Sequence, residues 1–381
     1  MRVVIAPDSF KESLTAREVA AAVRRGVEQV WPQADVVEMP LADGGEGTAD
    51  ALVAATGGRW VPVVVSGPQG TPVEAGFGLL GDGRTGVVEL AAASGIDVAL
   101  PQDRDVLTAD TYGTGELIAA ALDHGVTRLV IGLGGSATND GGAGLLRALG
   151  AEVLDADGAP IAPGGAALAG ARTLDVTGLD PRLAGVDIDV ACDVDNPLTG
   201  PTGASAVFGP QKGAGPEDVA LLDLALGQWA DVVALGRSDL RDAPGAGAAG
   251  GAGFAAIAVL GGRMRPGIEL VSDVVGLADV LAGSDLVITG EGRVDAQTMH
   301  GKTPAGVLDV ARSAGVPVVV IAGSVGPGAE ALLEAGAVAV VPTAPGPAST
   351  DELLADAAVN VERAARSVAA LWQAAGRTLS G

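Results

Sequence analysis

A dense group of charged and polar side chains follows one short apolar segment near residue 290. The stretch DLVITGEGRVDAQTMHGKTP runs over residues 285–304, and its first part, LVIT, has the composition of a short buried strand ending at a glycine. The residues that follow are Glu291, Arg293, Asp295, Gln297, His300 and Lys302. In a chain rich in Ala, Val and Gly, this concentration at the carboxyl end of a strand favours a binding loop over a merely solvated one.

Lysine is rare in this chain and occurs only in turns that contain glycine or serine. Of the 23 Lys and Arg residues, three are lysines: Lys11 in DSFKES, Lys212 in GPQKGA and Lys302 in HGKTP. Arginine therefore supplies the general positive charge of the surface. A compact ammonium beside flexible backbone suits the binding of phosphate as a point charge. The pattern favours phosphate binding over an accident of arginine-rich composition.

Length, charge and cysteine content limit the class of protein. A chain of 381 residues exceeds the ~250 residues at which single cores stop growing, which predicts two domains. The formal charge of −24 repels nucleic acid and anionic lipid, so an anionic ligand needs a local site. Cys192 is the only cysteine, which excludes an internal disulfide. The apolar runs are too short for a signal peptide or a membrane span of ~20 residues, so we expect a cytoplasmic protein.

Short aliphatic strands alternate with amphipathic helices, which is typical of an α/β protein with a largely parallel sheet. Residues 3–6 and 36–39 are predicted strands, and between them Thr15 and Glu18 have the spacing of a capping box at a helix start. Near the C-terminal end VPVVVIAG and AVAVVPTA are again predicted strands, followed by a long helix over about 351–375.

The middle of the chain has a different texture from its two ends. From Trp60 to about Leu90, predicted strands are joined by Gly/Pro turns with no helix between them. The two ends resemble each other more than either resembles this middle part. We therefore predict one discontinuous domain, residues 1–58 and 284–381, interrupted by an inserted mixed α/β domain at 59–283.

Five polar clusters follow or break the apolar segments, and ligands of open α/β sheets bind where such loops collect, outside the carboxyl ends of the strands. The clusters are APDSFKES, PLADGGEGT, GLGGSATNDGG, CDVDNPL with GASAVFGPQKGA, and TGEGRVDAQTMHGKTP. Together they supply carboxylates, amides, hydroxyls, lysines and glycines. These are the groups that phosphoryl transfer with Mg²⁺ requires.

Each cluster also has a purely structural interpretation. The glycines of GLGGSATNDGG are equally consistent with plain turns, although Ser136, Thr138 and Asn139 could offer donors to a phosphate. Asp193 could form an Asx turn instead of binding a metal. Asp43 could simply cap the helix that follows it.

The sequence partly matches two known nucleotide-binding motifs. GKT at 301–303 ends like a P-loop, but Ala296 replaces the required first glycine and no strand leads directly into the turn, so it is not a Walker motif. Gly132, Gly134 and Ala137 match G-x-G-x-x-G/A after a strand, so an NAD(P)-dependent oxidoreductase is the alternative enzyme class. That alternative leaves the three lysine turns without a role.

Six motifs, in order along the chain, resemble the bacterial glycerate kinases of the type that includes enzymes of glucarate and glyoxylate metabolism. The motifs are APDSFKESLTA (6–16), PLADGGEGT (40–48), GGSATNDGG (134–142), CDVDNPL (192–198), GASAVFGPQKGA (203–214) and TGEGRVDAQTMHGKTP (289–304). The resemblance spans nearly the whole chain and implies ATP-dependent phosphorylation of D-glycerate, giving 2-phosphoglycerate and ADP. It also implies a flavodoxin-like (Rossmann-like) domain formed by the two chain ends, with an inserted α/β domain.

Within this resemblance, the chemistry of phosphoryl transfer suggests a role for each candidate residue. The nucleotide phosphates are expected at Gly134, Gly135, Ser136, Thr138, Asn139, Lys212 and Lys302. Asp193 and Asp295 are expected either to bind Mg²⁺ or to accept the proton of the glycerate hydroxyl. Asp8, Ser9, Lys11 and Asp43 are expected to line the same cleft. Arg293 is the only arginine within the six motifs and is expected to bind the glycerate carboxylate through two parallel hydrogen bonds.

A non-catalytic regulator that binds a small ligand on the same scaffold is the alternative to an enzyme. The sequence leaves open whether the 2- or the 3-hydroxyl is phosphorylated, which residues hold the adenine and which group is the base. It is equally consistent with a monomer or a homodimer.

Overall fold

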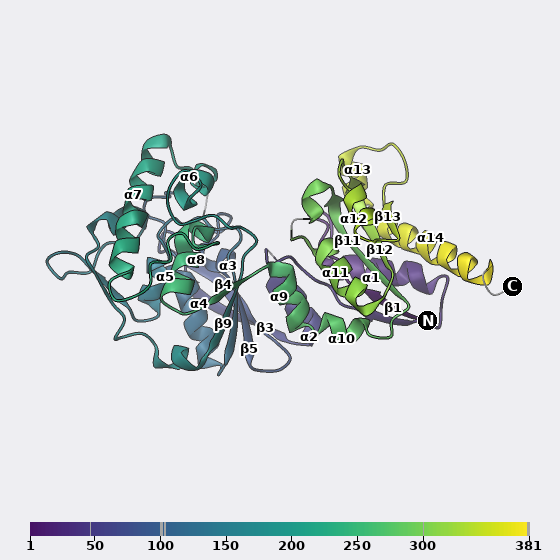
Figure 1. Ribbon diagram of the computed structural model, residues 1–381, viewed down its shortest axis with the longest axis horizontal. Coiled ribbons are helices and arrows are strands. Elements are labelled where there is room, and N and C mark those ends of the chain that lie inside the picture. The colour runs from purple at the N-terminus through teal and green to yellow at the C-terminus, as the bar shows by residue number, and fades with distance from the viewer. Residues whose placement is uncertain (46, 100–101, 103, 300, 379–381) are drawn as a thin grey trace. The chain divides into compact units, whose positions relative to one another are not determined.

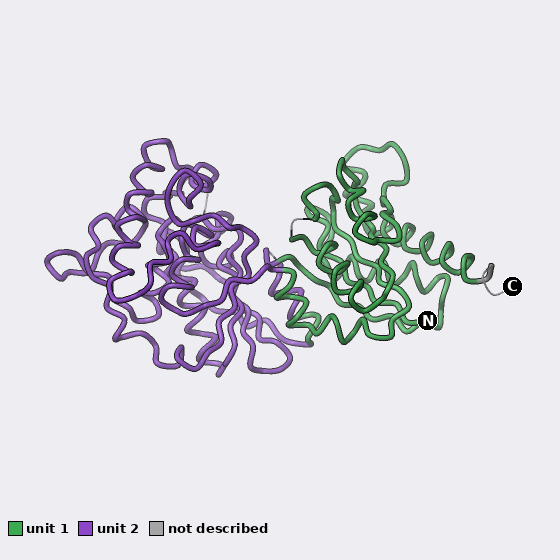
Figure 2. Tube along the Cα trace, in the orientation of Figure 1, with its two compact units in different colours: residues 1–43, 54–56, 268–381 green, residues 44–53, 57–267 purple. Residues whose placement is uncertain are grey.

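The structure is a computed structural model that describes residues 1–45, 47–99, 102, 104–299 and 301–378 (Figure 1). Glu46 and His300, which belong to two of the polar clusters, lie outside the described residues. The chain forms two compact units, distinguished by colour in Figure 2. Unit 1 comprises residues 1–43, 54–56 and 268–381, and unit 2 comprises residues 44–53 and 57–267.

Unit 1 is built on a five-stranded parallel sheet with the strand order β2-β1-β11-β12-β13. The strands are β1 (Arg2–Ile5), β2 (Asp35–Glu38), β11 (Leu286–Val294), β12 (Val318–Val325) and β13 (Ala339–Pro342). Numbered within the unit, the order is 2-1-3-4-5, which is the flavodoxin-like order. The predicted parallel sheet from the two chain ends is therefore confirmed.

The helices of unit 1 are α1 (Ala16–Glu28), α9 (Gly267–Val274), α10 (Leu277–Leu281), α11 (Thr303–Ala314), α12 (Glu330–Glu334), α13 (Thr350–Ala355) and α14 (Ala357–Thr378), with a 3₁₀ turn at Ala296–Met299. The predicted capping box of α1 is present: Thr15 Oγ1 accepts from the Glu18 N–H, and the Glu18 carboxylate accepts from the Thr15 N–H. Helix α1 packs closely on α14, where a Cβ on Gly26 would lie 2.2 Å from the Glu362 carbonyl oxygen. The long closing helix expected from the sequence is two helices, separated at Asp356.

The strand predicted at 286–289 continues past its glycine for the full length of β11. Gly290 does not end the strand but permits close pairing, because a Cβ there would lie 2.0 Å from the Ile321 carbonyl oxygen on β12. The added part pairs Arg293 with Ser324. The first charged residues of the cluster therefore lie on a strand, which fixes the directions of their side chains.

Unit 2 is a mixed α/β fold, as predicted for the inserted part. Its sheet has the order β10-β9-β6-β5-β4-β3, parallel from β10 to β5 and antiparallel from β5 to β3, and β7 and β8 form a separate antiparallel pair. The strands are β3 (Arg59–Ser66), β4 (Pro72–Leu79), β5 (Thr85–Glu89), β6 (Arg128–Gly132), β7 (Glu152–Leu154), β8 (Thr173–Asp175), β9 (Asp187–Ala191) and β10 (Arg263–Arg265). Its helices include α2 (Thr48–Thr56), α3 (Leu90–Ser94), α4 (Tyr112–Asp123), α5 (Ala143–Ala148), α6 (Ala204–Phe208), α7 (Pro216–Val233) and α8 (Ala248–Ala258).

The compact units change over at residues 43/44 and 267/268, with residues 54–56 at the end of α2 also in unit 1, whereas the sequence places the domain boundaries at 58/59 and 283/284. Two contacts account for the difference. The Ala49 N–H donates to the Glu89 carboxylate at 2.7 Å, which ties the start of α2 to unit 2. Ile268 packs against Gly306 of α11, so α9 joins unit 1. As limits of folding domains, the boundaries at 58/59 and 283/284 stay a prediction.

None of the helices in the described part of the chain is both long enough and apolar enough to cross a membrane.

Candidate active site

The strand order of unit 1 creates a topological switch point between β1 and β11. Open α/β sheets bind ligands outside the carboxyl ends of the strands at such a point. Asp8 follows β1, and Glu291 and Arg293 lie in the last part of β11. The Asp8 N–H donates to the Gly290 carbonyl oxygen at 2.8 Å and ties the two strand ends together. We call this region the β1/β11 edge.

Asp8 is held at this edge by donors from two segments. Its Oδ1 accepts from the Ser9 N–H at 2.6 Å, and its Oδ2 accepts from Thr303 Oγ1, the first residue of α11, at 2.6 Å. Burial, followed by the negative charge of Asp43, raises the pKa of Asp8 to about 6, although both hydrogen bonds oppose the rise. Glu291 adds a smaller repulsion. Asp8 therefore has a pKa about two units above that of an ordinary aspartate.

Glu291 and Lys302 form an ion pair at the same edge. The Lys302 Nζ lies 3.1 Å from Glu291 Oε2, and Thr298 Oγ1 donates to Glu291 Oε1 at 2.6 Å. Glu291 is only 8% exposed, and burial raises its pKa in spite of these partners. Lys302 is the N-cap residue of α11 and is about one-third exposed, so it remains within reach of a ligand.

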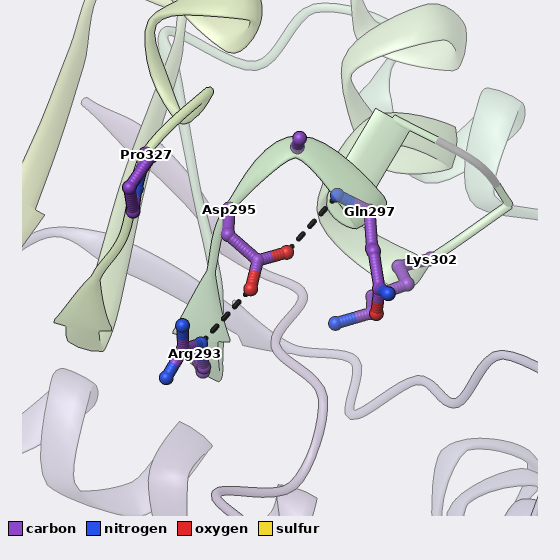
Figure 3. Close-up of a pocket in the computed structure, with 6 residues that line it drawn as sticks. Arg293, Asp295, Gln297, Lys302 and Pro327 are labelled. Atoms are coloured by element: carbon purple, nitrogen blue, oxygen red, sulfur yellow. Dashed lines mark hydrogen bonds and ion pairs between the residues drawn. The ribbon is translucent and has the colours of Figure 1, made fainter.

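A cavity of about 480 Å³ is lined by Arg293, Asp295, Ala296, Gln297, Lys302 and Pro327 (Figure 3). Arg293 Nε donates to Asp295 Oδ2 at 2.9 Å, and the Gln297 N–H donates to Asp295 Oδ1 at 3.0 Å. The hydrogen bond from Arg293 holds the pKa of Asp295 below its usual range. The Arg293 side chain is 66% exposed, which leaves its terminal nitrogens accessible. The cavity can therefore present two cations to a small anion.

The remaining predicted residues of unit 1 also lie near this edge. The DSFKES turn crosses β11 at Gly292, where an added Cβ would lie 3.2 Å from the backbone nitrogen of Lys11. The Lys11 side chain is exposed, and Asp43 is near enough for its charge to act on Asp8. Unit 1 thus brings together Asp8, Ser9, Lys11, Asp43, Arg293, Asp295 and Lys302.

Two further residues of this edge, Glu291 and Thr303, were not among the predicted site residues. Both lie within the TGEGRVDAQTMHGKTP motif. A hydroxyl directly after the motif's lysine, at the first position of a helix, was the signal that could have identified Thr303. The sequence could not distinguish Glu291 from a solvent-exposed glutamate, because it did not show that β11 continues past Gly290.

The GGSATNDGG loop of unit 2 connects β6 to α5 and is mostly buried. Gly134 and Gly135 form an exposed turn, and Gly135 has a left-handed φ of 68°. Thr138 and Asn139 are fully buried, and Asn139 Nδ2 donates to Ser205 Oγ at 2.9 Å. Within the described residues, the Thr138 hydroxyl and the Asn139 side-chain oxygen have no hydrogen-bond partner. Buried polar atoms of this kind are costly and mark a place where a ligand or water is needed.

Lys212 is buried against this loop. Its side chain is 4% exposed, and its Nζ donates to the Thr138 carbonyl oxygen at 2.6 Å. Burial lowers the pKa of Lys212 to about 7, and the negative charge of Asp140 opposes the shift. Ser136 is also buried. The Lys212 ammonium therefore binds the backbone of the loop. A direct contact between Lys212 and phosphate stays a prediction.

The two predicted metal ligands belong to different units. Asp193 follows β9 and accepts from the Gly267 N–H at 2.9 Å, whereas Asp295 lies in the cavity of unit 1. Across the described ranges, no group of three or more His, Cys, Asp or Glu is arranged to hold a metal ion. A Mg²⁺ site built from Asp193 or Asp295 therefore stays a prediction.

The GLGGSA turn lacks the helix that a dinucleotide-binding motif requires. In that motif the third position opens a helix whose N-terminus meets the pyrophosphate. Helix α5 begins at Ala143, well after Ala137, and ends at Ala148. The turn matches the spacing of the motif without its structural context.

A family model described as the glycerate kinase family matches residues 3–373. The chain belongs to the glycerate kinase family. A glycerate kinase of Bacillus subtilis (strain 168) is 52% identical over 97% of each chain, and the glycerate 2-kinase of Escherichia coli (strain K12) is 47% identical over 97% of each chain. The resemblance carried by the six motifs is confirmed.

The fold has a counterpart among solved structures. The crystal structure of a candidate glycerate kinase 2 from Salmonella typhimurium LT2 is 50% identical in sequence, covers 99% of each chain and superposes with a TM-score of 0.91. Membership of the glycerate kinase family implies ATP as the phosphate donor and a small molecule as the acceptor. The comparisons give no support to the oxidoreductase alternative.

Proposed function

We propose that this chain transfers the γ-phosphoryl group of ATP to the 2-hydroxyl of D-glycerate, giving 2-phosphoglycerate and ADP. The relative from Escherichia coli, at 47% identity over nearly the whole chain, is a glycerate 2-kinase. The observation in this molecule that supports the proposal best is the cavity of unit 1, where Arg293 and Lys302 face the same space (Figure 3). A small acid that carries both a carboxylate and a phosphate needs such a pair of cations in an otherwise acidic protein.

Glycerate is proposed to bind at the β1/β11 edge with its carboxylate on Arg293. The Nε atom of Arg293 is oriented by Asp295, so the planar guanidinium is held in place while its terminal nitrogens can form two parallel hydrogen bonds to a carboxylate. Asp8, Ser9, Lys11 and Asp43 form the rest of this acceptor site. Lys302 is proposed to stabilise the charge on the transferred phosphoryl group.

The nucleotide phosphates are proposed to bind the GGSATNDGG loop of unit 2. The exposed backbone N–H groups of Gly134 and Gly135 can donate to phosphate. The unpartnered polar atoms of Thr138 and Asn139 follow this turn within four residues of the sequence. Lys212 belongs to this site as the group that holds the Thr138 carbonyl. A direct bond from Lys212 to phosphate would require its ammonium to leave that carbonyl.

Mg²⁺ is proposed to accompany ATP, with Asp193 or Asp295 as its protein ligand. Mg²⁺ usually keeps several waters and binds through one or two carboxylates together with phosphate oxygens, so a single carboxylate fits its requirements. When bound it would neutralise charge on the phosphates. Both Asp295 oxygens accept hydrogen bonds, and Asp193 Oδ1 accepts the Gly267 N–H, so either carboxylate would bind Mg²⁺ beside these donors.

The proposed reaction places the protein in the cytoplasm, where ATP is available and a single cysteine stays reduced. The quaternary state is proposed to be a monomer or a homodimer. A regulator without catalysis would bind glycerate and release it unchanged, so turnover distinguishes the two functions.

The regiochemistry can be tested with enolase, which converts 2-phosphoglycerate but not 3-phosphoglycerate to phosphoenolpyruvate. Protein, Mg²⁺, ATP and D-glycerate are incubated with enolase alone or with enolase plus phosphoglycerate mutase. We expect phosphoenolpyruvate to form at the same rate in both. Formation only with the mutase would indicate the 3-hydroxyl, and no formation in either would contradict the kinase.

A further inference from the structure

Asp8 lies at the β1/β11 edge, where open α/β sheets bind their ligands. It lies directly after β1 at the switch point, and its N–H is bound to Gly290 of β11. Ser9 and Thr303 fix one carboxylate oxygen each, at 2.6 Å. A carboxylate can accept about four hydrogen bonds, so these donors orient Asp8 while leaving it able to accept another proton donor.

The charged groups that face Asp8 are mostly negative. Asp43, after β2, and Glu291, on β11, both repel its charge, and Lys302, at the start of α11, is paired with Glu291. Among the described residues, no lysine or arginine forms an ion pair with Asp8. Burial and Asp43 raise the pKa of Asp8 to about 6. Such a carboxylate is ionised at pH 7 and is still basic enough to take a proton during a reaction.

Two other carboxylates of this edge, Asp295 and Glu291, are less suited to proton transfer. Asp295 receives a hydrogen bond from the Arg293 guanidinium, which lowers its pKa and makes it a weaker base. Glu291 has one oxygen on Lys302 and the other on Thr298. Asp8 differs from these two carboxylates because its hydrogen-bond donors, Ser9 and Thr303, are neutral.

We propose that Asp8 is the catalytic base that takes the proton of the glycerate hydroxyl. This inference rests on the proposed function and assigns the base, which the proposed function left unassigned. The hydroxyl O–H bond breaks and its proton moves to Asp8, while the hydroxyl oxygen forms a bond to the γ-phosphorus of ATP. The bond from that phosphorus to the bridging oxygen breaks, and its electron pair leaves with ADP. Thr303 and Asp43 are positioning residues that orient Asp8 and set its basicity.

The first test is the pH dependence of kcat/KM for glycerate in wild type and in Asp8→Asn. The wild-type value should fall with unit slope below about pH 6. Asp8→Asn keeps the size and the hydrogen-bond acceptor, and it should lose about 10² to 10⁴ in kcat at pH 7.5, which is the usual contribution of such a base. Its remaining activity should show no acid limb. Thermal melting establishes that the variant is folded.

The second test uses two substitutions that should shift the acid limb in opposite directions. Thr303→Val removes a hydrogen bond that lowers the pKa of Asp8, so the limb should move to higher pH, by about one unit. Asp43→Asn removes a repulsion that raises that pKa, so the limb should move to lower pH. Thr303→Ser keeps the hydroxyl and is the matched control, with the limb unchanged. These shifts can be measured even if Asp8→Asn does not fold.

Three outcomes would overturn the proposal. One is activity of Asp8→Asn within a few-fold of wild type. Another is an acid limb that moves with neither Thr303→Val nor Asp43→Asn. The third is recovery of Asp8→Asn at high Mg²⁺, which would make Asp8 a metal ligand. If the wild type itself forms no phosphoglycerate, the proposed function fails instead, so the two failures are distinguishable.

Discussion

The β1/β11 edge of unit 1 and the GGSATNDGG loop of unit 2 are each contacted by a lysine from a glycine-containing turn, in opposite surroundings. Lys302 lies at the rim of a cavity, where its ammonium is paired with a carboxylate and remains partly exposed. Lys212 is 4% exposed and binds a backbone carbonyl. The same side chain is therefore accessible to a ligand in one unit and holds the loop itself in the other. The difference shows that a motif lysine has to be assigned from its burial before it is assigned a role in catalysis.

Among the substitutions that test this comparison, the largest effect is expected at Lys302. Lys302→Gln keeps a donor toward Glu291 but removes the positive charge, so kcat/KM for glycerate should fall by about 10² to 10³, the effect of losing one electrostatic contact to a transition state. Because Thr298 still binds Glu291, the melting temperature should change little. Steady-state kinetics and thermal melting check both parts. Near-normal activity in a folded variant would mean that the cavity lysine is not part of the site.

The second effect concerns the cavity's arginine. Arg293→Lys replaces a planar group by a point charge, so KM for glycerate should rise about tenfold to a hundredfold, equivalent to the ~1.5 to 3 kcal/mol of a charge-assisted hydrogen bond. KM for ATP and kcat should stay nearly unchanged. Arg312→Lys is the matched control, because Arg312 is equally exposed and also pairs with an aspartate nearby in sequence. A rise in KM for ATP, or a loss confined to kcat, would remove Arg293 from the glycerate site.

The third effect should appear in stability. Lys212→Met removes the donor to the buried Thr138 carbonyl, so the free energy of unfolding should fall by about 1 to 3 kcal/mol in denaturant titrations. The pH dependence gives a second measure. An unfolded lysine keeps its proton up to about pH 10.5 whereas the folded one loses it near pH 7, so the unfolded state holds more protons between these values.

The wild-type free energy of unfolding should therefore rise with pH from about 7 toward 10, and Lys212→Met should lack that part of the rise. A Lys212→Met protein that is as stable as wild type, yet as inactive as Lys302→Gln, would show that both lysines act on the phosphate. The comparison between the two units would then fail.

The smallest effect is expected in the turn after Asp8. Glu12 is not a glycine, yet it has a left-handed φ of 66°. Glu12→Gly should relieve this strain at some entropic cost, for a net gain of roughly 0.5 kcal/mol in the free energy of unfolding, with kinetics unchanged. A changed KM for glycerate would indicate that the turn's conformation, and not only its charges, contributes to the acceptor site.

The sequence predicted the α/β fold and the discontinuous parallel sheet because periodicity and Gly/Pro turns are local signals. It misplaced the end of the strand at Gly290, since the reason that strand continues is a neighbour more than twenty residues away in the chain, Ile321 on β12. The break at Asp356 in the closing helix was also missed, because no proline or glycine marks it.

The candidate residues of the site followed from motifs, but their surroundings did not. Burial separates Lys212 from Lys302, and no pattern in a single sequence reports the burial of a lysine in a turn. The raised pKa of Asp8 depends on Asp43 and on burial, both of which arise only when β1, β2 and β11 are adjacent. The motif alone predicted that Asp8 lines the site. Its raised pKa could be recognised only from the folded structure.

The central claim, transfer of a phosphoryl group from ATP to the 2-hydroxyl of glycerate, is tested most directly by a proton-coupled ³¹P NMR spectrum of the reaction mixture. A phosphate ester at the 2-position couples to a single carbon-bound proton, whereas an ester at the 3-position couples to two. With ATP, Mg²⁺ and D-glycerate, we predict a new monoester doublet that grows in step with ADP. A triplet, or ADP formation without any new ester, would contradict the account.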